Sequence, residues 1–301
     1  MRSIVRDYVR EQLPDYEELG ARFRFRLGRL CDILCAFIEN LTCELRNSRF
    51  RPAAFEMEVG KEISPLVIEG GGARILVRGK IDRLDVYEQD GKRYIRIVDY
   101  KTGKKDFSYS EIYQGLGMQL LLYLFAAWSG GDRALGGEVV PAGCCYAPVR
   151  DEPIVVADPE ITDEALEEMR RENARTSGLI IRDEEIWKAL DKSEKYDFLP
   201  LVRDRSGKVD PEKSDTYTLE QLGKLRVYAE SLLLRINEEI AEGEITINPF
   251  DDAAQDGLHS CQYCEMRPIC RYDGKRTARR EYPRFRRAEF WERIEGGEQD
   301  G

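Results

Sequence analysis

The chain has 301 residues, of which 42% are hydrophobic and 35% charged, and its formal net charge is −10. This balance is typical of a soluble globular protein, and no apolar run is long enough to cross a membrane. The negative charge argues against DNA binding by the chain alone, because phosphate contacts need Lys and Arg, but it does not exclude a nuclease inside a larger assembly. The eight cysteines fit no small disulfide scaffold, so we expect a cytoplasmic protein with a metal site.

Residues 1–50 are predicted to be a helical lead-in. From residue 4 to about residue 47 the sequence is helical in pattern, with apolar residues recurring at spacings of three and four from Leu27 to Leu45. Cys31, Cys35 and Cys43 lie in this stretch, at a spacing that matches no compact metal loop. We therefore predict that these cysteines are core residues, since free cysteine behaves as a small hydrophobic residue.

Residues 51–150 are predicted to form a β-rich core. Pro52 ends the helical region, and residues 53–59 form a strand that carries Glu56 and Glu58 on one face. Residues 63–69 and 74–77, with a glycine turn at 70–72 between them, are expected to extend the sheet.

The centre of this core is a predicted hairpin. Apolar, β-branched runs at 75–81 and 94–98 are joined through an Asp-Gly turn at 90–91, which indicates antiparallel neighbours. Asp82 and Asp99 should then converge at the open end, with Lys101 on the same face as Asp99. Two acids and a lysine can form a site for a hard cation such as Mg²⁺, as used in phosphodiester hydrolysis. A solvated polar face is the plainer alternative for an Asp-x-Lys sequence.

A core helix is predicted at 111–128, capped by Ser110 and ended by glycines at 130–131. Gln119 and Tyr123 are one turn apart on it, so they form a polar strip that we expect to face the strand ends. Residues 138–147 form a further strand, in which Cys144 and Cys145 point to opposite faces and are interpreted as packing residues.

Residues 151–249 are predicted to be a charged, irregular insertion followed by a long helix. Short amphipathic helices are expected at 162–173 and 183–190, an exposed loop at 204–214, and the long helix from Thr218 to about residue 241. We assign no chemistry to this insertion. The whole sequence lacks a phosphate-binding P-loop motif, so it does not hydrolyse ATP by that route.

Residues 250–301 form a predicted cysteine loop and basic tail. Cys261, Cys264 and Cys270 have Cys-x₂-Cys-x₅-Cys spacing, which is a strong metal-ligand signal. With His259 they could form a tetrahedral zinc site, and with one distant cysteine they could hold a [4Fe–4S] cluster. An Arg-rich stretch at 271–287 follows.

The motifs together resemble a known family. Gly-x-Ile-Asp-Arg at 79–83, Asp-Tyr-Lys at 99–101 and Gln-x-x-x-Tyr at 119–123 are similar to the motifs of RecB-type PD-(D/E)XK nucleases. With the cysteine loop, the sequence resembles the C-terminal nuclease domain of AddB-type subunits from about residue 20 to about residue 275. The resemblance implies an α/β fold of restriction-endonuclease type, with a mixed sheet flanked by helices and a C-terminal cysteine staple.

The resemblance also implies roles for individual residues. Asp82, Asp99 and the carbonyl of Tyr100 would hold Mg²⁺, and Lys101 would orient the attacking water or help deprotonate it. Gln119 and Tyr123 would contact DNA or position Lys101, and Glu56 would bind the metal through water. Cys261, Cys264 and Cys270 would hold a structural [4Fe–4S] cluster, with Zn²⁺ as the alternative. The expected partners are single-stranded DNA from a helicase and an AddA-type helicase–nuclease subunit, in double-strand break repair and recombination.

The sequence departs from the family in two places. The family has a histidine metal ligand on a helix before the first strand and a fourth cysteine further upstream, whereas the single histidine here is His259. We therefore expect the chain to be a C-terminal fragment that begins after the histidine helix. The alternative functions are an inactive nuclease-fold module for DNA binding or scaffolding, a zinc-stabilised interaction protein, and a stand-alone CRISPR-associated exonuclease of RecB type.

Overall fold

The computed structural model describes residues 2–13, 15, 18, 20–103, 105–149, 161–193, 195–251, 261, 264–272, 280–281 and 283–296. Contacts between residues divide the chain into two units. The first comprises Met1–Leu66, Val77–Phe107 and Gln119–Leu219, and the second comprises Val67–Leu76, Ser108–Met118 and Glu220–Gly301. The predicted nuclease motifs therefore all fall within the first unit.

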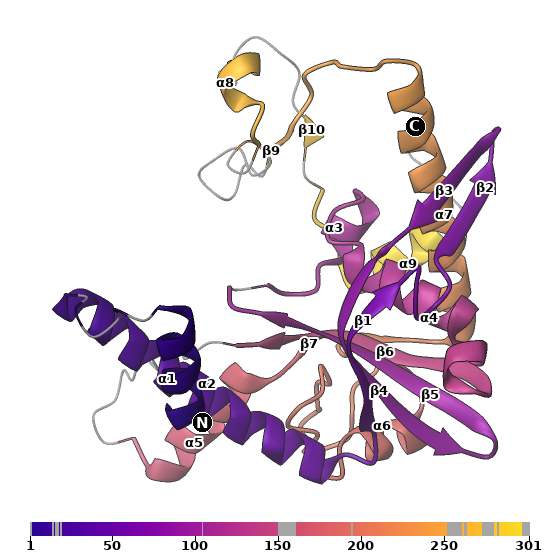
Figure 1. Ribbon diagram of the computed structural model, residues 1–301. Coiled ribbons are helices and arrows are strands. Elements are labelled where there is room, and N and C mark those ends of the chain that lie inside the picture. Colours follow the sequence, from indigo (N-terminus) through magenta and orange to yellow (C-terminus); the bar gives the residue numbers. More distant parts are fainter. Residues whose placement is uncertain are drawn as a thin grey trace. The chain divides into compact units, whose positions relative to one another are not determined.

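The first unit is built on a six-stranded sheet with the order β1-β4-β5-β6-β7-β8 (Figure 1). The strands are β1 (Arg51–Val59), β4 (Gly79–Gln89), β5 (Lys92–Lys101), β6 (Glu138–Pro148), β7 (Ser177–Ile181) and β8 (Thr216–Tyr217). The β5–β6 and β7–β8 pairs are parallel, while the other neighbours are antiparallel. The expected mixed sheet of an α/β fold is thus confirmed.

The β4–β5 hairpin forms as predicted. Its register runs from Gln89 opposite Lys92 at the turn to Arg83 opposite Val98 near the open end. Asp90 and Gly91 have φ values of 53° and 76°, the conformation that a two-residue type I′ turn requires. The Asp-Gly pair therefore sets the register that brings the predicted carboxylates to the open end.

Helices cover both faces of this sheet. The helical lead-in forms α1 (Arg2–Gln12) and α2 (Ala21–Asn47), and α2 packs Phe37 edge-on against Tyr100 of β5 with ring centres 5.3 Å apart. The helix α4 (Gln119–Leu135) contacts β1, β5 and β6. Side chains alternate along a strand, so β5 presents Tyr100 to α2 and Ile95 and Ile97 to the opposite face. Buried apolar residues between layers include Ile81, Leu84, Leu120, Leu121, Leu124, Phe125, Val139 and Ala142.

The predicted helix at 111–128 is wrong in its bounds. Two helices are present, α3 (Tyr109–Tyr113), capped by Ser108 instead of Ser110, and α4. Gly115 and Gly117 separate them, with φ values of 78° and 63° that a helix cannot contain. The glycines at 130–131 do not end α4. A side chain at Gly130 would lie 3.1 Å from Ser64, so this glycine permits close packing within the helix.

Two strands were placed in the wrong sheet, and two others were not predicted. β2 (Leu66–Gly70) and β3 (Ala73–Val77) form a two-stranded sheet of their own and do not extend the main sheet. The chain turns at Gly60, with φ of 101°, and thereby leaves the edge of β1. The charged insertion contributes β7 and β8 to the main sheet, besides the expected helices α5 (Asp163–Ala174) and α6 (Glu184–Leu190).

The second unit holds most of the β2–β3 hairpin together with α3, α7 (Leu219–Ala241) from its second residue and α9 (Arg287–Gly296). Within it, Tyr228 of α7 donates a hydrogen bond of 2.5 Å to the carbonyl of Tyr113. The ring of Tyr109 packs against Phe290, with centres 5.0 Å apart. The short elements β9 (Phe250–Asp251), α8 (Arg267–Cys270) and β10 (Arg280–Glu281) complete it. Among the described residues, no helix is both long and apolar enough to span a membrane.

Candidate active site

Asp82 and Asp99 meet at the open end of the β4–β5 hairpin. Arg83 pairs with Val98, so Asp82 and Asp99 face each other one step further along the register. The carboxylate of Asp82 accepts a 2.9 Å hydrogen bond from the backbone N–H of Tyr100. This bond fixes Asp82 against the residue that separates Asp99 from Lys101.

Lys101 completes this group. Its ammonium lies 2.6 Å from Oδ2 of Asp99 and 5.7 Å from the ring centre of Tyr146 on β6. Burial raises the pKa of Asp99 above its usual value, the ammonium of Lys101 opposes the rise, and the negative charge of Asp82 adds to it. The structure thus brings together the two carboxylates and the lysine that the sequence singled out.

The donor atoms at this end of the hairpin fit a hydrated Mg²⁺. Such an ion usually keeps several waters and takes one or two carboxylates from the protein. Oδ2 of Asp99 is buried, and its one partner in the described part of the chain is the ammonium of Lys101. No group of three or more His, Cys, Asp or Glu side chains is gathered for metal binding among the residues that the structure describes. The site therefore fits a metal held by two carboxylates and completed by water, not an all-protein cage.

Glu56 lies beside this site on β1. Phe55 pairs with Arg83 and Met57 with Ile81, so Glu56 occupies the register position opposite Asp82. Its φ of 53° is in the left-handed region, which costs a non-glycine residue on the order of 1 kcal/mol. The carboxylate is exposed and forms a 3.1 Å ion pair with Lys80. The predicted water-mediated metal contact stays a prediction.

Gln119 and Tyr123 form the expected polar strip on α4. Gln119 donates a 3.2 Å hydrogen bond to the hydroxyl of Tyr123, which also accepts one of 3.3 Å from the backbone N–H of Lys80. A Cβ at Gly79 would collide with this hydroxyl, so Tyr123 can pack here only because residue 79 is glycine. The strip therefore contacts the start of β4, two residues before Asp82.

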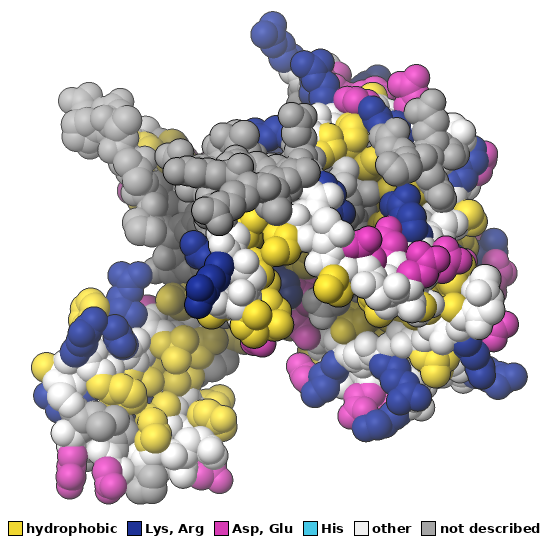
Figure 2. All heavy atoms as spheres, turned by 90° about the horizontal axis from the view of Figure 1, so that it is seen from above, with side chains coloured by type: hydrophobic (Ala, Val, Ile, Leu, Met, Phe, Trp, Pro, Cys, Tyr) yellow, Lys and Arg dark blue, Asp and Glu magenta, His cyan; other side chains and the backbone are white. Residues whose placement is uncertain are grey.

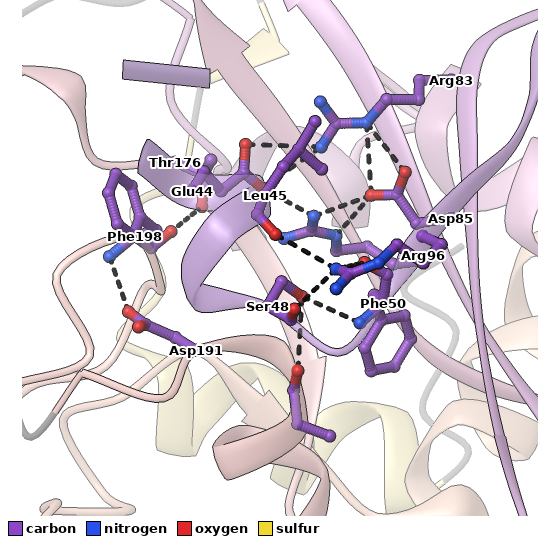
Figure 3. Close-up of polar contacts among 12 residues, drawn as sticks. Glu44, Leu45, Ser48, Phe50, Arg83, Asp85, Arg96, Thr176, Asp191 and Phe198 are labelled. Carbon is purple, nitrogen blue, oxygen red and sulfur yellow. Dashed lines mark hydrogen bonds and ion pairs between the residues drawn. The ribbon is translucent and has the colours of Figure 1, made fainter. Parts of the chain in front are cut away.

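The opposite face of the hairpin carries a buried ion cluster that was not predicted from the sequence. It consists of Glu44 from α2, Arg83 and Asp85 from β4, and Arg96 from β5 (Figure 3). Arg96 lies 2.6 Å from Glu44 and 2.7 Å from Asp85, and Arg83 lies 3.0 Å from Asp85 and 3.2 Å from Glu44. The side chains are at most 8% exposed. Charged residues alternating within β-branched runs were the signal that could have revealed it.

This cluster combines burial with close charge pairing, and it contacts the active-site strand β5. Burial alone would lower the pKa of Arg96, but the carboxylates of Glu44 and Asp85 outweigh burial and raise it. Arg83 also donates a 2.9 Å hydrogen bond to the hydroxyl of Tyr100. Tyr100 is therefore held from both sides of the sheet, by Arg83 through its side chain and by Asp82 through its backbone.

The cysteine loop is only partly described. Cys261 is buried, Cys270 half-buried and Cys264 exposed, and His259 lies outside the described residues. In the described part of the chain these thiols are not gathered into a metal-binding group, so the predicted cluster stays a prediction. Cys144 and Cys145 are buried in β6, and burial raises the pKa of Cys145 to about 11, as expected for packing residues. Cys31 is buried, whereas Cys43 is exposed, which corrects its prediction as a core residue.

Comparison with known proteins decides the family. A family model described as the PD-(D/E)XK nuclease superfamily matches residues 2–271. The chain belongs to the PD-(D/E)XK nuclease superfamily. The family resemblance noted from the sequence is thus confirmed, while the catalytic roles of Asp82, Asp99 and Lys101 stay a prediction.

Several curated relatives of this chain share one name. The chain is 35% identical to an ATP-dependent helicase/deoxyribonuclease subunit from Acetivibrio thermocellus over 76% of its own length and 20% of that protein. It is 32% identical to the protein of the same name from Clostridium tetani over 90% of the chain and 24% of the relative. The protein of that name from Symbiobacterium thermophilum is 31% identical over 92% and 24%, respectively. The chain thus spans about a fifth to a quarter of the length of these relatives.

Proposed function

We propose that this chain is a Mg²⁺-dependent deoxyribonuclease domain that hydrolyses DNA strands as part of an AddAB-type helicase–nuclease. The observation that carries the proposal is the meeting of Asp82, Asp99 and Lys101 at one hairpin end. Support comes from membership of a nuclease superfamily and from relatives whose name includes helicase and deoxyribonuclease.

Each residue of the site has a distinct chemical task in this proposal. Asp82, Asp99 and the carbonyl of Tyr100 would hold the metal, which when bound lowers the pKa of a coordinated water and stabilises charge on the phosphate. Lys101 would orient this water and help its deprotonation through its positive charge, and it would offset negative charge that develops on the phosphate. The hydrogen bond from Tyr100 keeps Asp82 in place while the strand binds.

The wider assembly is also part of the proposal. We infer an AddA-type partner subunit, work in double-strand break repair and recombination in the cytoplasm, and a strand delivered by the helicase. Cys261, Cys264 and Cys270 would hold a structural [4Fe–4S] cluster, or zinc as the alternative. The support for that metal is the Cys-x₂-Cys-x₅-Cys spacing and the family resemblance.

Digestion of linear single-stranded DNA tests the proposal. The full-length protein is incubated with labelled DNA and Mg²⁺, and Asp99→Asn is compared with Asp90→Asn. Both changes remove one carboxylate from the same hairpin, but Asp90 is exposed at the turn, where asparagine also tolerates positive φ. We expect Asp99→Asn to lose at least about a hundredfold in rate, while Asp90→Asn keeps the wild-type rate.

Two results would contradict the assignment. Digestion that Asp99→Asn leaves unchanged would show that the chemistry lies elsewhere. Equal inactivity of wild type and both variants would favour an inactive nuclease-fold module for DNA binding or scaffolding. Iron analysis and visible absorbance identify the metal bound by the cysteines independently of the digestion assay, since an iron–sulfur cluster is coloured and zinc is not.

A further inference from the structure

Several strand ends meet at the same end of the main sheet as the carboxylates. Val59 of β1 pairs with Gly79 of β4, Asp99 of β5 pairs with Tyr146 of β6, and Tyr146 pairs with Ser177 of β7. Five neighbouring strands at about 4.8 Å spacing make an edge about 19 Å long. At about 3.4 Å per stacked nucleotide, five or six nucleotides would span this edge.

A cationic hollow lies on the β1–β4 side of the carboxylates. Its volume is about 400 Å³, and its charged lining residues are Lys61, Arg78, Lys80 and Glu58. Lys61 pairs with Glu58 and Lys80 with Glu56, whereas Arg78 has no ion-pair partner among the described residues. The side chain of Arg78 passes over Gly60, where a Cβ would lie 3.1 Å from it. We name this site the first hollow.

A second and much smaller hollow, of about 20 Å³, lies on the β5–β7 side. It is lined by Lys101, Lys105, Arg175 and Asp106 together with uncharged residues that include Tyr146 and Ser177. Nε of Arg175 is buried and has no hydrogen-bond partner within the described residues, and Nη1 reaches the carbonyl of Leu201 only at 3.5 Å. Each hollow thus holds three cations and one carboxylate, in a chain whose formal net charge is −10.

Both hollows carry more cations than carboxylates. Figure 2 shows acidic and basic side chains interspersed over the face that it draws. The two hollows instead concentrate cations on either side of Asp82 and Asp99, at the same end of the sheet. Arginine and lysine hold nucleic acids mainly through the phosphates, independently of sequence.

We propose that the two hollows bind phosphates of a single DNA strand on either side of the cut, so that the strand crosses the sheet end from β1 to β7. The inference rests on the proposed nuclease function and deepens it by naming the residues that position the substrate. Arg78 binds a phosphate of the strand on one side of the carboxylates, and Arg175 binds a phosphate on the other side. Arg175 belongs to the charged insertion, to which we assigned no chemistry from the sequence. Phosphate binding by Arg175 would give this insertion a function.

We call the path of the strand across the two hollows the track. Measuring strand binding in the absence of cleavage tests it. Fluorescence anisotropy of a labelled oligothymidylate is measured with the full chain in EDTA, for Arg78→Gln, Arg175→Gln, the double variant and Arg205→Gln. Each track variant should bind about three- to tenfold more weakly and lower the slope of log affinity against log salt by about 0.7. The losses should multiply in the double variant, because the two sites are separate. Arg205 is exposed in a loop outside both hollows, and its variant should bind as wild type does.

The outcomes decide between distinct interpretations. Unchanged affinity and salt slope in both single variants would overturn the proposal. A loss of affinity in only one variant would show that only one hollow binds DNA, which would overturn the proposed crossing of the sheet end. If Arg175→Gln lowers the melting temperature, Arg175→Lys keeps the charge and should restore most of the binding. Track binding without Mg²⁺-dependent cleavage would contradict the proposed function alone. Cleavage with unchanged KM in the double variant would contradict the track alone.

Discussion

Gly79 and Tyr123 show how single residues shape the start of β4. The hydroxyl of Tyr123 accepts hydrogen bonds from Gln119 and from the backbone of Lys80. It can do so only because residue 79 has no side chain, since a Cβ there would collide with the hydroxyl oxygen and lie 2.7 Å from the ring. Packing therefore requires glycine at the first position of the Gly-x-Ile-Asp-Arg motif. This glycine allows β4, which carries Asp82, to lie close to α4.

Gly79→Ala tests this requirement. We expect the variant to lose about 1–3 kcal/mol of unfolding free energy, as overpacked cores do, measured by urea denaturation. Gly103→Ala is the matched control, because nothing lies within 4 Å of its added Cβ. The cost of Gly79→Ala should shrink in a Tyr123→Phe background, which removes the nearest atom. An equal cost in both backgrounds would show that Tyr123 is not the obstacle.

Part of the site could be predicted at this scale. Asp82, Asp99 and Lys101 were found because a period of two and an Asp-Gly turn fix both the face and the register of a hairpin. The conformation of Glu56 could not be predicted, since a positive φ in a strand depends on the surrounding sheet rather than on the residue. The ion pair between Lys80 and Glu56 was not predicted for the same reason.

At the scale of elements, the buried ion cluster fixes α2 to the sheet. Glu44 is its one contribution from α2, and it faces both Arg83 and Arg96. Taking four charges out of water is costly, so the cluster is weak evidence for net stabilisation. Removing one member is a different matter, because it leaves an uncompensated buried charge.

Glu44→Ala should therefore destabilise the first unit strongly. We expect a loss of about 3–5 kcal/mol in unfolding free energy, typical of breaking a buried pair, seen as a lower midpoint in urea. Glu39→Ala removes an exposed carboxylate from the same helix and should change stability by less than about 0.5 kcal/mol. Similar effects of the two substitutions would mean that the cluster does not hold α2.

The elements that sequence reasoning placed wrongly share a cause. The strands β7 and β8 are short and lie inside a charged segment, so their pairing comes from the completed sheet instead of a local pattern. The break between α3 and α4 depends on two glycines with positive φ, whereas the glycines inside α4 are tolerated for packing. Glycine alone does not tell these two uses apart. By contrast, β5, β6 and α7 have strong periodic patterns, and their existence was predicted correctly.

At the scale of the whole molecule, the eight cysteines differ in environment. Cys144 and Cys145 are buried in β6, while Cys43 on α2 and Cys264 in the C-terminal loop are exposed. A thiolate is the reactive form, and burial raises the pKa of Cys145 to about 11. Exposed cysteines should therefore react faster than buried ones. An exposed thiol that resists modification must be covered by another group or bound to a metal.

Alkylation by iodoacetamide at mildly alkaline pH uses this division to test the cysteine metal. In the chelated native protein, mass spectrometry should find Cys43 and Cys264 modified first, and Cys144 and Cys145 only after unfolding. In protein reconstituted with iron and sulfide, Cys264 should become protected, because a thiolate bound to metal does not react, while Cys43 stays reactive as an internal control. If Cys264 reacts equally in both preparations, it holds no metal and the cluster proposal fails. Protection by zinc alone would select the zinc alternative.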